Sequence, residues 1–413
     1  MEMFRKLLTF DEAQQVIHQR FKPKASGVEE ITLLEDCNRV LAEDVTATMN
    51  IPPFNRSTVA GYAIKAVDTF GADENKPARL KLCGTVNVGE PTKTAVTRGT
   101  TVEIVTGAPI PEGADAVVMV EHTERKDNDL YVYGAVAKDE NIMKAGADIK
   151  KGEKVLKAGQ VLGSREIGVL AALGMAKAKF YRIPRVAVLS TGAEITEPGR
   201  RLPPGKIYDI NAYSLSAAVL ESGGKPVYLG VFPDDMAELQ KTLKQALTSA
   251  DMVVTSGGVS VGPKDVMPQA LDSLGKPGVI VCGIAIKPGK PTTVALIDKK
   301  LVFSLPGHPA SALLVFHLLT RPIIKCMAGM KAEKNLRVKA FMAMRIFSAK
   351  GRRTFIMVRL KRDKSNRLVA EPVPTGLSGA ITTLAKADGF VEIAENQQYI
   401  DVNEEVAVHL FKR

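Results

Sequence analysis

The sequence predicts a multidomain chain with a doubly wound α/β core domain, a β-rich inserted domain and a small, β-barrel-like C-terminal domain. Three observations lead to this prediction. Between residues 184 and 328, strand patterns alternate with helical patterns, as in a parallel sheet covered by helices. Residues 51–143 contain short apolar runs separated by turn-forming residues, and strand-like runs return in residues 329–413. At roughly 100–200 residues per domain, 413 residues accommodate this division.

The first part of the chain is predicted to form a discontinuous helical and linking domain, residues 1–50 with residues 144–183. Thr9 and Glu12 have the spacing of a capping box, and apolar residues follow at helical intervals before Pro23. A second helical pattern covers Ser164–Leu173 and ends at Gly174.

The other elements follow from hydrophobic periodicity. The expected strands of the core are Val186–Leu189, Pro226–Val231, Met252–Thr255 and Leu301–Ser304. The expected helices of the core are Ala212–Glu221, Met236–Ser249, Val266–Leu274 and Ala310–Met327. The apolar runs of the β domains are Arg79–Val88, Thr101–Val105, Ala116–Val120, Leu130–Val136, Leu336–Met344, Thr354–Leu360 and Glu404–His409.

Composition narrows the function classes. With 45% hydrophobic and 24% charged residues, the chain has the composition of a soluble globular protein. No run approaches the ~20 apolar residues of a membrane-spanning helix, so we expect a cytoplasmic protein without membrane contact. The four cysteines lie far apart, without zinc-like spacing, and are expected to be buried thiols. Aromatic residues make up only 5%, which argues against a base-stacking nucleic-acid surface.

A net charge of +11 is compatible with nucleic acid, an anionic membrane surface or small anionic substrates. Two glycine-containing turns favour small anions. Ser190–Glu194 follows the first core strand, and Ser256–Gly262 follows a later one and opens a helix. Ligands of open α/β sheets bind beyond the carboxyl ends of the strands, where glycines and helix N-termini accommodate anions. Glycines after strands are often only turn formers, so the two turns together carry the argument.

Carboxylates are expected on the same edge of the sheet. They are Glu194, Asp209, Asp234 and Asp265. Such a cluster beside phosphate-binding turns favours a hard cation, Mg²⁺, that bridges to a substrate phosphate. For Asp209, Asn211 and Asp235 taken singly, helix capping is the stronger interpretation.

Two further segments of the core carry charge or strand-to-helix turns. In Lys-Pro-Gly-Lys-Pro, two prolines stiffen the turn and hold Lys287 and Lys290 as fixed cations near an anion, with solvated surface lysines as the alternative. The segment Pro306–Ser311 leads from a strand into a helix, with Pro309 suited to the first helical turn. His308 is an acid–base candidate, but a polar loop residue is the preferred interpretation.

At these positions the sequence resembles the molybdopterin molybdenumtransferases, a family whose eukaryotic relative is the E domain of gephyrin. The resemblance runs nearly end to end and rests on Asn38–Val45, Thr106–Gly113, the turn at Thr191, Ser256–Gly262, Lys287–Pro291 and Pro306–Ser311. The last three segments, in this order, are specific to the family.

The resemblance implies an elongated homodimer of four-subdomain chains. Such chains take adenylylated molybdopterin and molybdate, insert the metal at the dithiolene and release AMP with the help of Mg²⁺. The implied partners are a molybdopterin adenylyltransferase as upstream donor and molybdoenzymes downstream, with no role for nucleic acid. The active cleft would be shared with the β-rich domain of the other subunit.

The resemblance also implies site residues. The catalytic residues would be Asp148, Glu194, Asp234, Asp265 and Thr106, of which Glu194, Asp234 and Asp265 would bind the metal. The substrate-binding residues would be Thr191, Gly192, Ser256, Gly257, Gly258, Ser260, Lys287, Lys290, Pro306, Gly307, Pro309 and Ser311. The molybdate-binding residues would be Arg352, Arg353 and Ser378.

Three positions depart from the family pattern. Ala60 stands where the family has an aspartate before Gly-Tyr-Ala, and Ala147 and Ala193 stand where acidic residues are common. Each alanine removes a carboxylate from a site built around metal and anhydride chemistry. Since alanine neither binds a cation nor positions water, binding can survive while turnover falls.

Three functions remain open at this point. The first is an active molybdenumtransferase, or a weakened or tungstate-specific variant, which the retained carboxylates and lysines favour. The second is a gephyrin-like scaffold that binds a partner peptide between the α/β and C-terminal domains, which the three alanines favour. The third is an adenylyltransferase that charges molybdopterin, ranked last because it would not need the two β domains.

Overall fold

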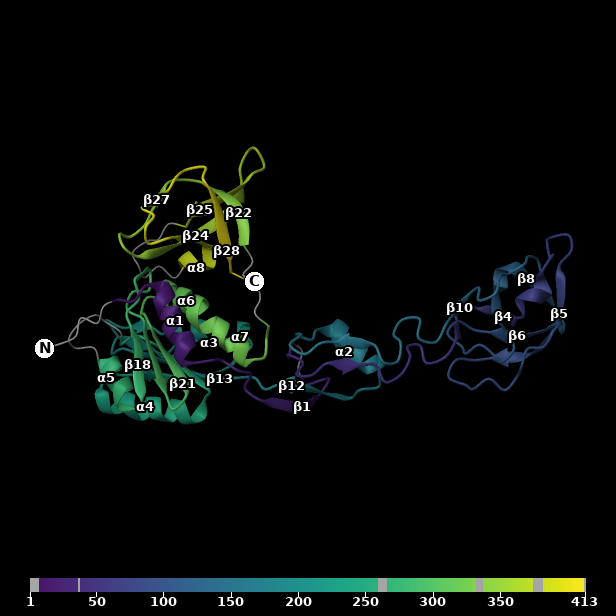
Figure 1. Ribbon diagram of the computed structural model, residues 1–413, viewed down its shortest axis with the longest axis horizontal. Coiled ribbons are helices and arrows are strands. Elements are labelled where there is room, and N and C mark those ends of the chain that lie inside the picture. Colours follow the sequence, from purple (N-terminus) through teal and green to yellow (C-terminus); the bar gives the residue numbers. More distant parts are fainter. Residues whose placement is uncertain (1–6, 36–37, 259–265, 332–336, 374–381, 412–413) are drawn as a thin grey trace. The chain divides into compact units, whose positions relative to one another are not determined.

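The computed structural model describes residues 7–35, 38–258, 266–331, 337–373 and 382–411. The chain divides into two compact units. One comprises Met1–Glu29 with Lys179–Arg413, and the other comprises Glu30–Ala178. The α/β sheet and the C-terminal β domain both belong to the first unit (Figure 1).

The core of the first unit is a six-stranded sheet with the order β16-β13-β17-β21-β20-β18. Its strands are β13 (Arg185–Thr191), β16 (Lys225–Phe232), β17 (Met252–Ser256), β18 (Pro277–Cys282), β20 (Thr293–Ile297) and β21 (Lys300–Leu305). The first four in the order are parallel, which confirms the predicted α/β core. β20 and β18 are antiparallel, so the sheet is mixed rather than wholly parallel as predicted. The reason is the tight turn between β20 and β21, which only antiparallel strands can use.

Helices cover both faces of this sheet. They are α3 (Asn211–Glu221), α4 (Met236–Ser249), α5 (Val266–Ser273), α6 (Pro309–Val315) and α7 (Arg321–Met327). Successive residues of β13 alternate between two apolar clusters: Val186 packs with α3, α6 and α7, and Ala187 packs with α4 and α5. A π-helical turn, η3 (Phe316–Thr320), joins α6 to α7, where Pro322 provides no backbone N–H.

The continuous helix Pro309–Met327 is long and apolar enough to cross a membrane, although the sequence predicted no such segment. More than half of the tested stretch is buried in the protein, as in the core helix of a folded domain.

The N-terminal helix α1 (Phe10–Arg20) has the predicted capping box between Thr9 and Glu12. Its buried residues Phe10, Ala13 and Ile17 belong to the same apolar cluster as the core sheet. The sequence grouped this helix with residues 144–183, and the structure instead packs it on the α/β core. An amphipathic pattern identifies the buried face of a helix but not the element that covers it.

The C-terminal domain is a closed barrel, as predicted. Its elements are β22 (Arg337–Met342), β23 (Ile346–Phe347), β24 (Arg353–Arg362), β25 (Leu368–Pro372), α8 (Thr382–Lys386), β26 (Gly389–Ile393), β27 (Tyr399–Ile400) and β28 (Glu405–Leu410). The order β24-β25-β22-β28-β26 closes because β26 also pairs with β24. A short strand from the α/β part of the chain, β19 (Ile286–Lys287), pairs in parallel with β24. Between β13 and α3, β14 (Ile195–Thr196) pairs with β15 (Ile207–Tyr208).

The second unit is built around a six-stranded sheet with the order β7-β4-β6-β5-β9-β8. Its elements are β2 (Val45–Thr46), β3 (Arg56–Ser57), β4 (Gly61–Ile64), η1 (Ala66–Thr69), β5 (Ala78–Val86), β6 (Thr100–Ile104), β7 (Ala116–Met119), η2 (Val120–His122), β8 (Thr123–Lys126), β9 (Asp129–Val132), β10 (Ile142–Met143), β11 (Lys154–Leu156) and α2 (Ser164–Ala172). β1 (Val28–Thr32) and β12 (Lys177–Tyr181) pair where the chain passes between the units. β2 pairs with β11, and β3 with β10.

A cluster of rings joins η3 to the C-terminal barrel. The ring of His317 meets the rings of Phe390 and Phe411 edge-on at 5.9 and 5.3 Å. Its Nδ1 lies 3.0 Å from a guanidinium nitrogen of Arg321. Burial, and then the positive charge of Arg321, lower the pKa of His317 to about 4. His317 is therefore neutral in the folded protein at neutral pH.

This burial predicts a loss of stability in mild acid. In the unfolded chain this histidine has its ordinary pKa of about 6.5, so between pH 6.5 and 4 it is protonated in the unfolded chain and neutral in the folded one. The free energy of unfolding is therefore unaffected by this group above pH 6.5 and falls as the pH is lowered, by roughly 2 kcal/mol at pH 5. Urea denaturation of wild type and His317→Gln at pH 7 and 5 measures it. We expect the variant to lose less stability than wild type, and the exposed control His18→Gln to behave as wild type. Equal pH dependence in wild type and His317→Gln would contradict this assignment.

Candidate active site

The candidate site lies where the strand order of the core sheet reverses. From β13 the chain runs through α3 to β16 on one side, and it then passes through α4 to β17 on the other side of β13. The carboxyl ends of β13 and β17, at Thr191 and Ser256, are neighbours at this edge. Such a switch point is the usual ligand site of an open α/β sheet, as the sequence predicted.

Two glycines bring the chain ends at the switch point into close contact. A Cβ on Gly257 would lie 2.2 Å from the carbonyl oxygen of Thr191, and the φ of Gly257 is +94°. A Cβ on Gly258 would lie 2.8 Å from Oγ1 of Thr191 and 3.2 Å from a carboxylate oxygen of Asp234. Only glycine fits this approach, so the predicted residues Thr191, Gly257, Gly258 and Asp234 do come together.

The side chain of Asn211 ties two of these turns to each other. Its amide nitrogen donates to Oγ of Ser256 at 2.7 Å and to the carbonyl oxygen of Gly307 at 2.6 Å. Ser256 in turn donates to the carbonyl oxygen of Pro306 at 3.3 Å. Asn211 is the first residue of α3 and does not cap it, contrary to the capping interpretation. An asparagine at the start of a helix that follows a glycine-lined strand end is the signal that could have revealed this role.

Asp209 does stabilise the start of α3, as capping predicted. One carboxylate oxygen accepts from the Ala212 backbone N–H at 3.0 Å and from Oγ of Ser190 at 2.9 Å. Burial, and then the negative charge of Asp209, raise the pKa of the nearby Tyr228 hydroxyl. Asp235 likewise caps α4. One of its carboxylate oxygens accepts the backbone N–H of Ala237 at 3.0 Å and that of Glu238 at 3.1 Å.

Three buried oxygen atoms at this edge have no hydrogen-bond partner among the residues the structure describes. They are Oγ1 of Thr191, the second carboxylate oxygen of Asp209 and Oδ1 of Asn211. Buried acceptors are normally satisfied, because an unpaired one costs about 1–3 kcal/mol. These three oxygens are covered by protein, so they mark a strained polar cluster behind the switch point and not a surface that a ligand contacts.

Two of the three predicted metal-binding carboxylates belong to this edge. The carboxylate of Glu194 lies close to Gly192. A Cβ built on Gly192 would be 2.7 and 2.8 Å from its two oxygens. Asp234 lies over Gly258. Asp265 and Ser260 fall outside the described residues. Among the described residues, no three His, Cys, Asp or Glu side chains are grouped closely enough to hold a metal ion, so the Mg²⁺ site stays a prediction.

The lysine turn lies at the same edge. It leads directly into β20, whose first residue Thr293 pairs with Ser304 near the end of β21. A Cβ on Gly289 would lie 2.5 Å from a methyl group of Val315, so the turn packs closely on α6. Lys290 is fixed through its carbonyl oxygen, which accepts the N–H of Ile284 at 3.0 Å. The Lys287 side chain is exposed and Lys290 is half-buried.

The turn after β21 completes this edge. Pro306 is buried, and Pro309 occupies the first turn of α6, as predicted. His308 precedes the helix without capping it through its side chain. Ser311 is buried on the first turn.

The positive charge of the protein is concentrated in the unit that holds this edge. Residues 30–178 contain 18 Lys and Arg against 21 Asp and Glu, while the rest of the chain contains 38 against 24. The unit with the switch point therefore has a net charge of +14, which favours an anionic ligand over a neutral one.

Comparison with known proteins identifies the family. Three family models match in order: the MoeA N-terminal region (domain I and II) over residues 8–174, a probable molybdopterin binding domain over residues 187–326, and the MoeA C-terminal region (domain IV) over residues 339–411. The molybdopterin molybdenumtransferase of Haemophilus influenzae is 32% identical over 407 residues, 98% of this chain and 99% of that one. That of Staphylococcus aureus is 34% identical over 380 residues, 92% of this chain and 89% of that one. The chain belongs to the molybdopterin molybdenumtransferase family.

The solved structures agree with this assignment. The crystal structure of a molybdopterin biosynthesis MoeA protein from Pyrococcus horikoshii matches with a TM-score of 0.86 and 40% identity, over 99% of this chain and 100% of that one. Membership of the family makes the chain a transferase of molybdenum cofactor biosynthesis.

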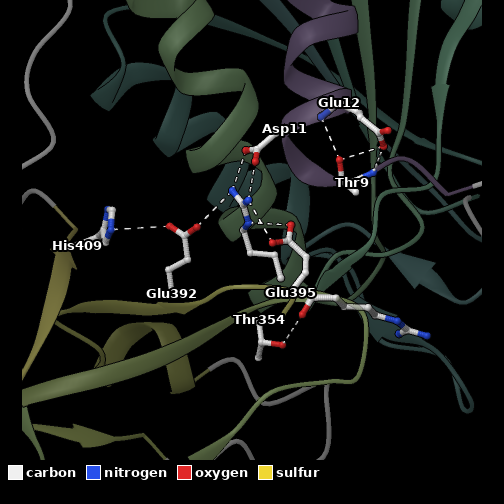
Figure 2. Close-up of polar contacts among 9 residues, drawn as sticks. Thr9, Asp11, Glu12, Thr354, Glu392, Glu395 and His409 are labelled. Carbon is white, nitrogen blue, oxygen red and sulfur yellow. Dashed lines mark hydrogen bonds and ion pairs between the residues drawn. The ribbon is translucent and has the colours of Figure 1, made fainter. Parts of the chain in front are cut away.

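The arginines predicted from the molybdenumtransferase family to bind molybdate differ in their surroundings. The side chain of Arg353 is only 14% exposed, and all its guanidinium nitrogens contact carboxylates of Asp11, Glu392 and Glu395 (Figure 2). Arg352 is half-buried, and its carbonyl oxygen accepts the Thr354 hydroxyl at 3.2 Å. Ser378 falls outside the described residues.

The remaining predicted residues of the molybdenumtransferase pattern belong to the second unit. Thr106 is exposed in the turn after β6, beside Ala60 at the start of β4, since Gly61 pairs with Ile104. Asp148 is exposed, and its backbone N–H donates to the Ile51 carbonyl oxygen at 3.0 Å. Their catalytic roles stay predictions.

The close approach at the switch point predicts unequal effects of two alanine substitutions. In Gly257→Ala the new Cβ meets the Thr191 carbonyl and the backbone keeps a strained φ, so we expect a loss of about 3 kcal/mol or more. In Gly307→Ala the nearest atom is 3.9 Å away, at Cα of Gly257, and we expect a loss below about 1 kcal/mol. Urea denaturation measures both. Similar losses would contradict the proposed packing of the turns.

Proposed function

We propose that this chain inserts molybdate into adenylylated molybdopterin and releases AMP. The observation that carries the proposal is the pairing of two chemistries on one sheet edge. Glycine turns bring Thr191, Gly257, Gly258 and Asp234 together at the switch point, and the lysine turn occupies the same edge beyond β21. Glycine turns admit phosphate oxygens and lysines offset their charge, so the edge matches the phosphoanhydride of adenylylated molybdopterin.

Each group has a distinct task in this reaction. The glycine turns would let the backbone approach the phosphates. Lys287 and Lys290 would offset the negative charge that shifts onto the leaving phosphate as the phosphoanhydride bond breaks. Breaking that bond would release AMP and make insertion of molybdate at the dithiolene favourable.

The donor chemistry fits the predicted Mg²⁺. Glu194 and Asp234 offer carboxylate oxygens, the ligands that Mg²⁺ prefers, beside the two glycine turns. These two residues would hold the ion, which would supply additional positive charge to the anhydride. The family further supports a homodimer in which the partner completes the cleft, an adenylyltransferase as donor of the substrate, molybdoenzymes as recipients of the product, and a cytoplasmic location.

The reaction predicts molybdate-dependent AMP release. The protein is incubated with adenylylated molybdopterin and Mg²⁺, with and without molybdate, and AMP and molybdenum cofactor are quantified. Lys287→Gln and Lys290→Gln should each lower the rate about tenfold to a hundredfold, because one fixed charge is lost near the anhydride. Lys299→Gln is the matched control, since Lys299 is exposed in the hairpin turn at the opposite end of β21. Substrate binding without molybdate-dependent AMP release would overturn the proposal and favour a peptide-binding scaffold. AMP release with tungstate alone would identify the tungstate-specific variant.

The missing aspartate predicts a gain of function. Ala60 is exposed, so Ala60→Asp adds a carboxylate without burying a charge. We expect AMP release to rise about tenfold or more, with the free energy of unfolding changed by less than about 0.5 kcal/mol. The matched control Ala135→Asp adds a carboxylate at another exposed alanine of the same unit and should leave AMP release unchanged. If Ala60→Asp leaves turnover unchanged, the absent carboxylate does not limit the reaction.

A further inference from the structure

The strand that carries Lys287 is held between two distant parts of the chain. On one side, the backbone N–H of Ala285 donates to the carbonyl oxygen of Leu8 at 2.8 Å. On the other side, the backbone N–H of Arg353 donates to the carbonyl oxygen of Ala285 at 3.0 Å, and β19 pairs in parallel with β24. In this pairing Lys287 lies opposite Thr354. The segment that leads into the lysine strand therefore contacts Leu8, just before α1, and β19 itself is the edge strand beside β24 of the barrel.

The side chain of Arg353 joins the two flanking segments directly. Its Nη1 and Nη2 donate to the two carboxylate oxygens of Asp11 at 2.8 and 2.7 Å, in the first turn of α1. Its Nε donates to Glu395 at 3.0 Å, and Nη1 lies 3.3 Å from Glu392 (Figure 2). The guanidinium also lies 5.3 Å from the ring centre of Phe10. A bidentate pair of this kind fixes orientation as well as distance.

The charge of this cluster excludes an oxyanion. Three carboxylates surround one guanidinium, so the cluster has a net charge of −2 when they are ionised. His409 lies 4.0 Å from Glu392, but burial lowers its pKa, so it adds no compensating charge at neutral pH. Molybdate would have to displace a carboxylate from a buried arginine to reach it.

We propose that Arg353 and Asp11 are positioning residues, which lock the first turn of α1 to β24 and so fix the strand that presents Lys287. This inference rests on the proposed function for the role of Lys287, but not for the mechanical link. Of the three carboxylates, Asp11 is the most exposed at 69%, against 33% for Glu392 and 26% for Glu395. Asp11→Asn therefore breaks the link without leaving a buried charge unpaired.

Hydrogen exchange tests the link without any substrate. In Asp11→Asn, the amides of Ala285 and Arg353 should exchange roughly fivefold faster than in wild type, as expected for loss of one partly exposed ion pair. Asp401→Asn breaks the bidentate pair of Asp401 with Arg345 on the same barrel. This control should leave the two amides unchanged. Unchanged exchange in Asp11→Asn, or equal acceleration in a control, overturns the inference.

Kinetics tests whether the link acts through Lys287. Asp11→Asn should lower kcat roughly fivefold and leave the KM for adenylylated molybdopterin within about twofold, because the displaced lysine offsets less of the charge that develops as the anhydride breaks. The same substitution made in Lys287→Gln should change kcat less than about twofold, since no lysine remains to be positioned. Equal effects in both backgrounds overturn the inference. Absence of molybdate-dependent AMP release in wild type counts against the proposed function alone, and hydrogen exchange then decides the link by itself.

Discussion

The geometry of the candidate site depends on the side-chain carboxamide of Asn211. Its amide nitrogen donates hydrogen bonds to Ser256 at the end of β17 and to Gly307 after β21, so one planar group sets the spacing of two strand ends. The third strand end, at Thr191, is fixed by the approach of Gly257 to its carbonyl oxygen. The Oδ1 atom of the same carboxamide is buried and has no hydrogen-bond partner among the described residues. The interaction that sets the spacing of the strand ends therefore also carries an uncompensated polar cost.

The charge of the first unit differs between two length scales, the whole unit and the surroundings of single residues. Over the whole unit, an excess of 14 positive charges attracts anions regardless of their shape. At the edge itself, the positive charge is local, because Lys287 is exposed and Lys290 half-buried in the turn that lies beyond β21 from the switch point. Arg353 shows that the two scales differ, because this arginine contributes to the net charge while its own surroundings are negative.

Much of this was predictable from sequence, for a physical reason. The rule that ligands bind beyond the carboxyl ends of strands predicts from sequence that Thr191, Ser256, Gly257 and Asp234 share one edge of the sheet, and the structure brings them together. Local patterns also gave the core strands and helices. What sequence could not give were pairings over long separations: Phe10 in the core cluster, Asp11 on Arg353, and Asn211 on Gly307. Many partners satisfy an amphipathic face or a single charge equally well, and only the packed fold selects one.

The alanine at position 60 is not a consequence of packing. The next residue, Gly61, is constrained, because a Cβ there would lie 1.9 Å from the Val118 carbonyl oxygen. Ala60 itself is exposed, and its carbonyl oxygen accepts the Val120 N–H at 3.2 Å, a backbone contact that any residue can make. The fold of β4 therefore tolerates an aspartate at this position as well as an alanine. Neither the stability of the sheet nor the course of the backbone therefore requires an alanine at position 60.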